Sequence, residues 1–271
     1  DGYTFHLPTA HDSGGSNAIA RRYAKTVSGV QYLYTGVLVS WLQAAVYPIL
    51  IDPDFTADTA DGFVWGIDAV YSTARSTSLS FNITSAIAEV GQYFAGGNYT
   101  VERGFLKFGT GSIPDGATFS SVTMKLVCIS DFSTTDFDVQ IAKYDWSASD
   151  PITAGNRETA YDGALAAALD DNIWRNTNGI VVNTQYSSGA LNTAWVNKLG
   201  YTYYALRSKQ DTDSVAPGGN EYIAIATQEN ATAAYRPVLT VVYTSTVIIV
   251  GWASTVASIP SGWARETSLD G

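Results

Sequence analysis

Alternation of hydrophobic and polar positions is clearest along residues 103–129. From Val122 to Cys128, hydrophobic side chains fall on every second position, as in a half-buried strand of an antiparallel sheet. An earlier run of the same kind is separated from this one by Ile113-Pro-Asp-Gly, in which Pro suits the second position of a β-turn and Gly its end. The two runs predict a hairpin around which the remaining strands are organised.

Short strand-like segments recur at spacings of about ten residues. They lie at 61–65, 71–75, 78–81, 136–142, 201–207, 221–227 and 236–243. Helical patterns are limited to two short stretches, 164–169 and 191–198. Many short strands with little helix predict an all-β chain, a jelly-roll-like antiparallel β-sandwich.

The first sixty residues are less regular. A short hairpin is predicted from residues 31–34 and 36–39, followed by a helical turn capped by Ser40 and an extended strand at 47–53. We therefore expect an N-terminal arm and linker hairpin at 1–60, the sandwich at 61–245 and a C-terminal extension at 246–271.

Composition narrows the classes of partner. Charged residues make up 15% of the 271, and the formal net charge is −10. This balance argues against binding to nucleic acid or to anionic lipid, since both require a basic surface. No hydrophobic run is long enough to span a membrane. The single cysteine, Cys128, cannot form an intramolecular disulfide, and its place on the inward face of a strand predicts a small buried hydrophobe.

Residues for acid–base or zinc chemistry are scarce. The two histidines, His6 and His11, both lie in the irregular arm, which argues against a histidine-based triad or a zinc centre. Gly109-Thr-Gly lacks the helix that a phosphate-binding loop requires. The sequence therefore predicts no catalytic residue.

Aspartates gather in three places, and glycosidases need only two well-placed acids. These aspartates are Asp131, Asp136, Asp138, Asp170, Asp171, Asp211 and Asp213. Their ordinary interpretation is that of solvated turn residues. One loop could instead hold Ca²⁺, which prefers oxygen ligands, and a catalytic pair is the third alternative. Apart from this calcium alternative, no metal or cofactor is expected.

Four aromatic residues lie in or beside expected loops, where a flat ring could stack on a sugar. They are Trp146, Trp174, Tyr186 and Trp195. The alternative is that these large rings fill the core or contacts between subunits. We treat the four as candidate carbohydrate-binding residues.

Several motifs resemble those of the disaggregatase-related (DNRLRE-type) β-sandwich modules. The similar segments are Arg103-Gly-Phe-Leu-Lys-Phe, Ile113-Pro-Asp-Gly-Ala-Thr, Met124-Lys-Leu, Ala205-Leu-Arg-Ser, Gly219-Asn-Glu-Tyr and Tyr235-Arg-Pro-Val-Leu. The resemblance covers roughly residues 61–245. It implies a β-sandwich that serves as an adhesive, spacer or glycan-associated unit of phage tails, virions or bacterial surface proteins.

The end of the chain suggests attachment. Residues 251–263 resemble the opening of phage tail-fibre tip domains. An apolar stretch at 246–252 precedes and overlaps this segment. Its exposure to solvent would be energetically unfavourable. Its candidate assembly contacts are Val247, Ile248, Ile249, Val250 and Trp252. Pairing with a neighbouring subunit by strand addition is the simplest use of such a segment.

These observations favour a non-enzymatic structural or adhesive subunit of an extracellular assembly, such as a phage tail fibre, a virion appendage or a surface filament. Its expected partners are copies of itself, other structural subunits and a cell-surface glycan. A carbohydrate-binding module of a polysaccharide-degrading protein is the first alternative. A glycoside hydrolase or lyase is the second, and it requires two carboxylates that face one cleft.

Overall fold

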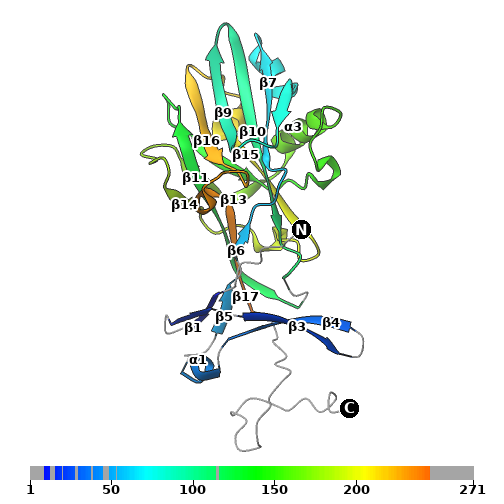
Figure 1. Cartoon of the computed structure of the whole chain (residues 1–271). Helices are drawn as coiled ribbons and strands as arrows, with labels where there is room; N and C mark the ends of the chain where they lie inside the picture. Colours follow the sequence, from blue (N-terminus) through cyan, green and yellow to red (C-terminus); the bar gives the residue numbers. More distant parts are fainter. Residues whose placement is uncertain are drawn as a thin grey trace, which may run out of the picture.

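The computed structural model describes residues 9–12, 16–19, 21–27, 30–37, 39–44, 49–52, 54–113 and 116–244 (Figure 1). The main body is an antiparallel sheet of twelve strands. Its strands are β6 (Asp54–Thr56), β7 (Gly62–Asp68), β8 (Ser80–Asn82), β9 (Ile87–Ala95), β10 (Asn98–Gly109), β11 (Thr118–Asp131), β12 (Asp138–Ala142), β13 (Leu169–Asn176), β14 (Gln185–Ser187), β15 (Tyr201–Ser208), β16 (Asn220–Ala226) and β17 (Val238–Thr244). This architecture confirms the predicted all-β, sandwich-like fold.

The sheet divides into two layers at β10. The first part of this strand, residues 98–102, pairs with β9, whereas residues 104–109 pair with β15. From β9 the sheet continues through β16 to β11, β17 and β6. Gly91 in β9 pairs with Glu102 at the point of division, and its φ of 134° suits glycine. The two ends of the sheet can therefore lie over one another and enclose a core.

The hairpin predicted within residues 103–129 is wrong. β10 pairs with β7, β9 and β15, while β11 pairs with β14, β16 and β17. The two consecutive strands therefore pair with other strands and not with each other. The reason is that β10 is buried on both faces, with Phe105 facing one way and Leu106 and Phe108 the other. Alternation identifies a strand's faces but not its neighbour.

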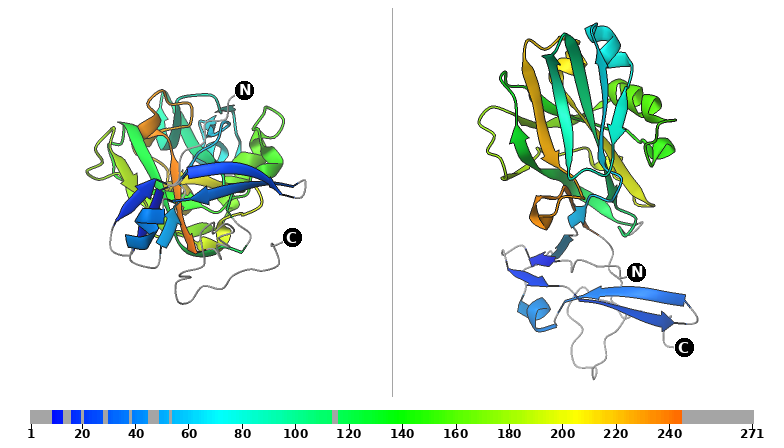
Figure 2. Two further views of the ribbon diagram at one scale, coloured as in Figure 1. Left: turned by 60° about the horizontal axis from the view of Figure 1, so that its bottom comes forward. Right: turned by 45° about the horizontal axis from the view of Figure 1, so that its top comes forward.

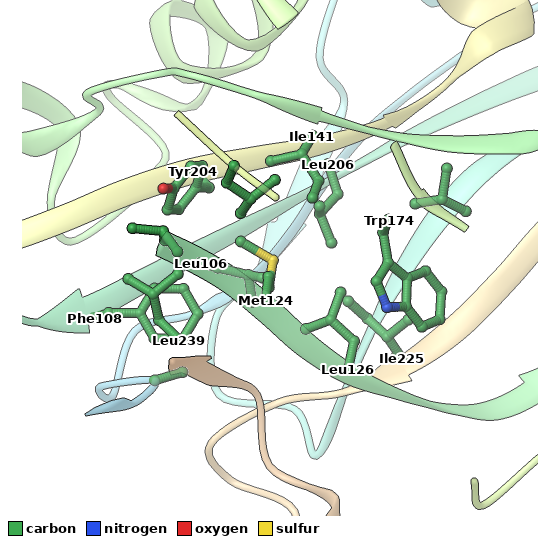
Figure 3. Packing of buried hydrophobic residues seen from close by; sticks show 14 of the residues in the cluster. Leu106, Phe108, Met124, Leu126, Ile141, Trp174, Tyr204, Leu206, Ile225 and Leu239 are labelled. Atoms are coloured by element: carbon green, nitrogen blue, oxygen red, sulfur yellow. The ribbon is translucent and has the colours of Figure 1, made fainter. Parts of the chain in front are cut away.

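The main core lies between the layers, where the predicted inward positions meet (Figure 3). Val122, Met124, Leu126 and Cys128 are all fully buried, as the alternation predicts. β11 pairs with β17 from residue 118 to residue 125, which places the two predicted strands side by side. Burial raises the pKa of Cys128 to about 12, so its thiol stays protonated and packs as a hydrophobe.

A second core covers the other face of the β10 layer. It is formed with α2 (Tyr71–Ser76), α3 (Arg157–Ala166) and the segment 146–152, and it includes Phe105, Trp146 and Tyr161 (Figure 1). The strand predicted at 71–75 is therefore wrong, because this segment is a helical turn that packs Ala74 against the sheet. The helix predicted at 164–169 begins earlier, at Arg157, and ends at Ala166. A short helix, α4 (Lys209–Asp213), follows β15.

The N-terminal strands form two small sheets outside the sandwich (Figure 2). One contains β1 (Thr9–Asp12), β2 (Asn17–Ile19) and β5 (Ile49–Asp52), and the other is the hairpin of β3 (Arg21–Val27) and β4 (Val30–Gly36). The hairpin therefore precedes the position predicted for it. The expected helical turn at Ser40 lies in α1 (Val39–Ala44). Residues 246–271, the predicted C-terminal extension, lie outside the described residues.

The sandwich begins before the predicted boundary at residue 61, because β6 pairs with β17. Among the described residues, no helix is long and apolar enough to cross a membrane.

Candidate functional site

Two of the four candidate sugar-stacking rings belong to the cores. Trp146 is 1% exposed, and its ring packs edge to face on Phe105 with centroids 5.8 Å apart. Trp174 is 3% exposed and lies among the core side chains between the layers (Figure 3). Neither indole offers a face to a ligand, so the prediction that these two bind a sugar is wrong. Position near a loop does not decide which way a ring turns.

Tyr186 and Trp195 are half-buried. The guanidinium of Arg175 lies 3.8 Å from the centroid of the Tyr186 ring and covers one of its faces. The Tyr186 hydroxyl accepts a hydrogen bond from the backbone N–H of Val181 (3.0 Å). Trp195, in contrast, lines a surface groove, and it is the predicted candidate whose surroundings suit a ligand.

The groove has a volume of about 690 Å³ and is built mainly from one continuous segment, to which Asp145 is added from the loop after β12. The segment runs from η2 (Thr193–Trp195) into the first residues of β15. The lining residues are Asp145, Ala194, Trp195, Val196, Asn197, Lys198, Leu199, Tyr201, Thr202 and Tyr203. Among its large hydrophobic and aromatic lining residues, Leu199 is 84% and Tyr201 40% exposed.

Hydrogen bonds fix the aromatic side of the groove. The indole N–H of Trp195 donates to the Tyr203 carbonyl (2.7 Å), which orients the indole against the start of β15. The rings of Tyr201 and Tyr203 lie with their centroids 6.2 Å apart. Three aromatic side chains are thus held on one segment, and their positions are set before any ligand binds.

Charged groups lie at the edge of these rings. The Lys107 ammonium is 3.0 Å from an Asp150 carboxylate oxygen, which also accepts a hydrogen bond from the Tyr203 hydroxyl (3.0 Å). Lys107 also lies 4.6 Å from the centroid of the Tyr201 ring. Burial, together with the Asp150 carboxylate, raises the pKa of Tyr203, so its hydroxyl remains protonated and keeps its hydrogen bond to Asp150.

The chemistry of this lining favours binding over hydrolysis. Aromatic faces with a few fixed polar groups suit a neutral, hydroxyl-rich ligand. Asp145 is the one acidic residue among those that line the groove, and its Oδ1 accepts a hydrogen bond from the backbone N–H of Ser147 (3.0 Å). A glycosidase needs a second carboxyl group across the cleft, and these residues do not supply it.

Several of the aspartates considered for calcium or catalysis have partners within the protein. Asp211 is bound by Arg103 and Arg75. Asp131 accepts hydrogen bonds from Ser133, and Asp170 accepts one from the backbone N–H of Asn192. Within the parts of the chain that the structure describes, no group of three or more acidic, histidine or cysteine residues is placed to hold a metal.

Two buried charged clusters were not predicted, although Asp211 was among the candidate aspartates. Arg103 and Asp211 form an ion pair inside the second core, and Asp61 lies against Glu229. The only sequence signal for the first is a charged residue within the otherwise apolar run of β10. The second joins distant segments and has no local signal.

Comparison with known proteins gives no relative: no protein-family model matches this chain, and no curated protein matches it significantly.

Proposed function

We propose that the protein is a non-enzymatic adhesive module of an extracellular assembly, whose sandwich binds a saccharide in the groove beside Trp195. The observation that carries the proposal is the group of aromatic residues on one segment: Trp195 is half-buried and Tyr201 is 40% exposed, and the largely buried Tyr203 lies beside them. The resemblance to glycan-associated DNRLRE-type modules is in accord with it. The net charge of −10 favours a neutral glycan over an acidic one.

Binding of the purified chain to a glycan array, followed by titration calorimetry with the best ligand, tests the proposal. We expect Tyr201→Ala and Trp195→Ala to weaken binding by at least about tenfold, since stacked aromatic residues dominate such contacts. Tyr201 is exposed, so its removal leaves the core intact.

Phe132→Ala is the matched control, because Phe132 is 43% exposed and lies outside the groove. Its variant should bind like the wild type. An array without any saturable ligand, or equal loss of binding in the control and in Tyr201→Ala, would contradict the proposal.

The second candidate is a purely structural subunit that assembles through its ends. It is favoured by the N-terminal strands, which form two sheets of their own outside the sandwich (Figure 2). The candidate assembly contacts at 247–250 and Trp252 lie outside the described residues. Removal of residues 1–30 or 246–271 should leave a folded chain that no longer assembles, as measured by light scattering and electron microscopy. Normal assembly of both truncated chains would exclude this role.

A further inference from the structure

The chain is divided into a basic segment and an acidic body. Residues 13–51 contain three basic residues, Arg21, Arg22 and Lys25, and no acidic one, whereas residues 54–244 contain twenty acidic and eleven basic residues. All three basic residues of the first segment lie in β3, one strand of the small hairpin outside the sandwich. A contrast of this kind favours contact between the basic part of one copy and an acidic surface of another.

Among the described elements, the hairpin of β3 and β4 stands by itself. It forms a sheet of two strands, and β3 and β4 pack extensively only against each other within the described part of the chain. An isolated two-stranded hairpin is marginally stable in water, so it gains stability from a surface on which it can pack. Figure 1 shows the hairpin at the end of the molecule opposite the turn between β9 and β10.

An aromatic cluster of Tyr93, Phe132 and Tyr222 lies on the sandwich near that turn. Tyr93 is two residues before the end of β9, and its ring centroid is 4.9 Å from that of Tyr222 in β16. The Phe132 ring is stacked on Tyr222, with centroids 4.8 Å apart and an interplanar angle of 16°. Phe132 is 43% exposed, and both tyrosines are half-buried. Exposed aromatic surface of this kind marks a site of interaction.

Negative charge accompanies the aromatic cluster. A hydrogen bond joins the carboxyl groups of Glu89 in β9 and Glu102 in β10, so the pair shares one proton and keeps one negative charge. Burial raises the pKa of Tyr222, and the charges of Glu102 and Glu89 raise it further, so the two acids lie close to this ring. β9 and β16 contain no lysine or arginine. Aromatic faces beside a negative charge attract ammonium and guanidinium groups.

We propose that the β3–β4 hairpin of one copy packs on the aromatic cluster of a second copy, with its arginine and lysine side chains toward the rings. Each strand of the hairpin has seven residues and is about 24 Å long. It exceeds the roughly 10 Å spanned by the three adjacent backbone segments that carry the cluster. The two copies contribute different surfaces, so each dimer keeps one free hairpin and one free cluster and can extend into a ring or a filament.

This interface names the surface that receives the N-terminal strands if the chain is a structural subunit. It is separate from the saccharide groove, because neither the hairpin nor the aromatic cluster supplies one of the described residues that line the groove. Calorimetric titration with a saccharide is therefore an independent measurement. Its failure would contradict the proposed saccharide binding and leave the interface between copies intact.

Sedimentation velocity of the full chain at rising concentration tests the interface. At about 50 mM NaCl the wild type should form dimers and longer oligomers, and at about 500 mM NaCl it should dissociate, because salt screens the contact. The hairpin variant carries Arg21→Ser and Lys25→Ser, and the cluster variant carries Phe132→Ala and Tyr222→Ala. Each should raise the dissociation constant of assembly by at least about tenfold.

The matched control removes the same two positive charges from the sandwich. Arg157→Ser and Lys209→Ser, at the starts of α3 and α4, make this change outside the hairpin and the aromatic cluster. The control should assemble like the wild type. Loss of assembly in the control equal to that in the hairpin variant would assign the effect to net charge and overturn the proposal.

A mixture of the two variants tests the head-to-tail arrangement directly. The hairpin variant keeps its aromatic cluster and the cluster variant keeps its hairpin, so an equimolar mixture should form dimers that do not extend further. A mixture that stays monomeric, a variant that assembles like the wild type, or a wild type that is monomeric at low salt would overturn the proposal. If circular dichroism shows that the cluster variant does not fold, Phe132→Ala alone takes its place, because Phe132 is exposed.

Discussion

Two buried charged sites in this protein are built in opposite ways. In the first, Arg103 places its guanidinium against Asp211, with Nε 2.7 Å from Oδ2 and Nη2 3.0 Å from Oδ1. The guanidinium also donates to the carbonyls of Tyr161 and Arg75, at 2.9 Å each. It stacks 3.8 Å from the centroid of the Tyr161 ring. In the second, Asp61 meets another acid, Glu229, and a hydrogen bond between the two carboxyl groups requires a proton on one of them.

In the first site, the charges of Arg103 and Asp211 compensate each other, and their polar atoms have hydrogen-bond partners. We call this the closed site, and the pair of Asp61 and Glu229 the open site. Arg75 adds a hydrogen bond to Asp211 Oδ1 (3.0 Å) and another to its carbonyl (2.6 Å). Burial alone lowers the pKa of Arg103, but the Asp211 carboxylate outweighs it and raises that pKa above its ordinary value. The cluster joins β10, α2, α3 and α4, so its role is structural.

The difference gives a criterion for finding sites from the structure alone. A buried charged group whose donors and acceptors all have hydrogen-bond partners within the protein has a structural role. A buried charged group with acceptor atoms that no donor in the protein satisfies indicates that another group, such as a proton or a ligand, is bound to them. Burial alone does not separate the two, since Arg103 and Asp61 are equally inaccessible.

The largest loss of stability is expected when the closed site loses Arg103. Arg103→Met leaves Asp211 buried with only Arg75 as its partner, and we expect a loss of about 3–5 kcal/mol in the free energy of unfolding. Urea denaturation measures it. Lys209→Met, which removes an exposed i,i+4 pair with Asp213 on α4, serves as the control and should leave the free energy of unfolding close to that of the wild type. Equal stability of the two variants would show that the buried pair contributes no more than a surface one.

Asp61 in the open site should make the free energy of unfolding depend on pH. The pKa of Asp61 is about 9 in the folded chain and near 3.8 when unfolded. The folded state therefore binds a proton that the unfolded state releases, and the stability should fall as the pH rises from about 4 to about 9. The slope from this one group is at most about 1.4 kcal/mol per pH unit.

Asp61→Asn should remove that part of the slope. Burial and Glu89 also raise the pKa of Glu102, so a slope of the same sign should remain in the variant. Denaturation midpoints at pH 5, 7 and 9 measure both. A wild-type slope that is unchanged in Asp61→Asn would show that this carboxyl ionises alike in the folded and unfolded chain.

Much of the fold could be predicted because strands are marked by local alternation. The inward positions of β11 from Val122 to Cys128 are all buried as expected, and β17 lies beside β11. The partner of β10 could not be predicted, because a strand buried on both faces has no polar side to orient it. The segment at 71–75 contains strand-forming residues, yet packing against β10 makes it helical.

The candidate site was predictable in part. Trp195 lines the groove, whereas the similar-looking Trp146 and Trp174 face the cores. Residue type and position near a loop are the same for all three, so only the fold separates them. Asp61 and Glu229 lie at opposite ends of the sandwich sequence, and no spacing rule could have paired them.

The smallest effect is expected at two buried tyrosines, Tyr161 and Tyr204, whose hydroxyl groups differ in their hydrogen bonds. Tyr161 donates to the Ala74 carbonyl (2.7 Å), with the Val101 carbonyl 3.1 Å away, whereas the Tyr204 hydroxyl has no partner. Both rings are fully buried. Tyr161→Phe should cost about 1–2 kcal/mol, because it removes a buried hydrogen bond.

Tyr204→Phe should be neutral or stabilising by up to about 1 kcal/mol, since it removes an oxygen whose desolvation nothing offsets. Paired urea denaturation of the two variants compares the same chemical change in the same fold. If Tyr204→Phe lost as much stability as Tyr161→Phe, the Tyr204 hydroxyl would have a hydrogen-bond partner in solution. A polar atom without a partner in the structure would then no longer distinguish an open site from a closed one. If the two substitutions changed the free energy of unfolding in opposite directions, the criterion of unsatisfied polar atoms would hold for neutral groups as well as for carboxylates.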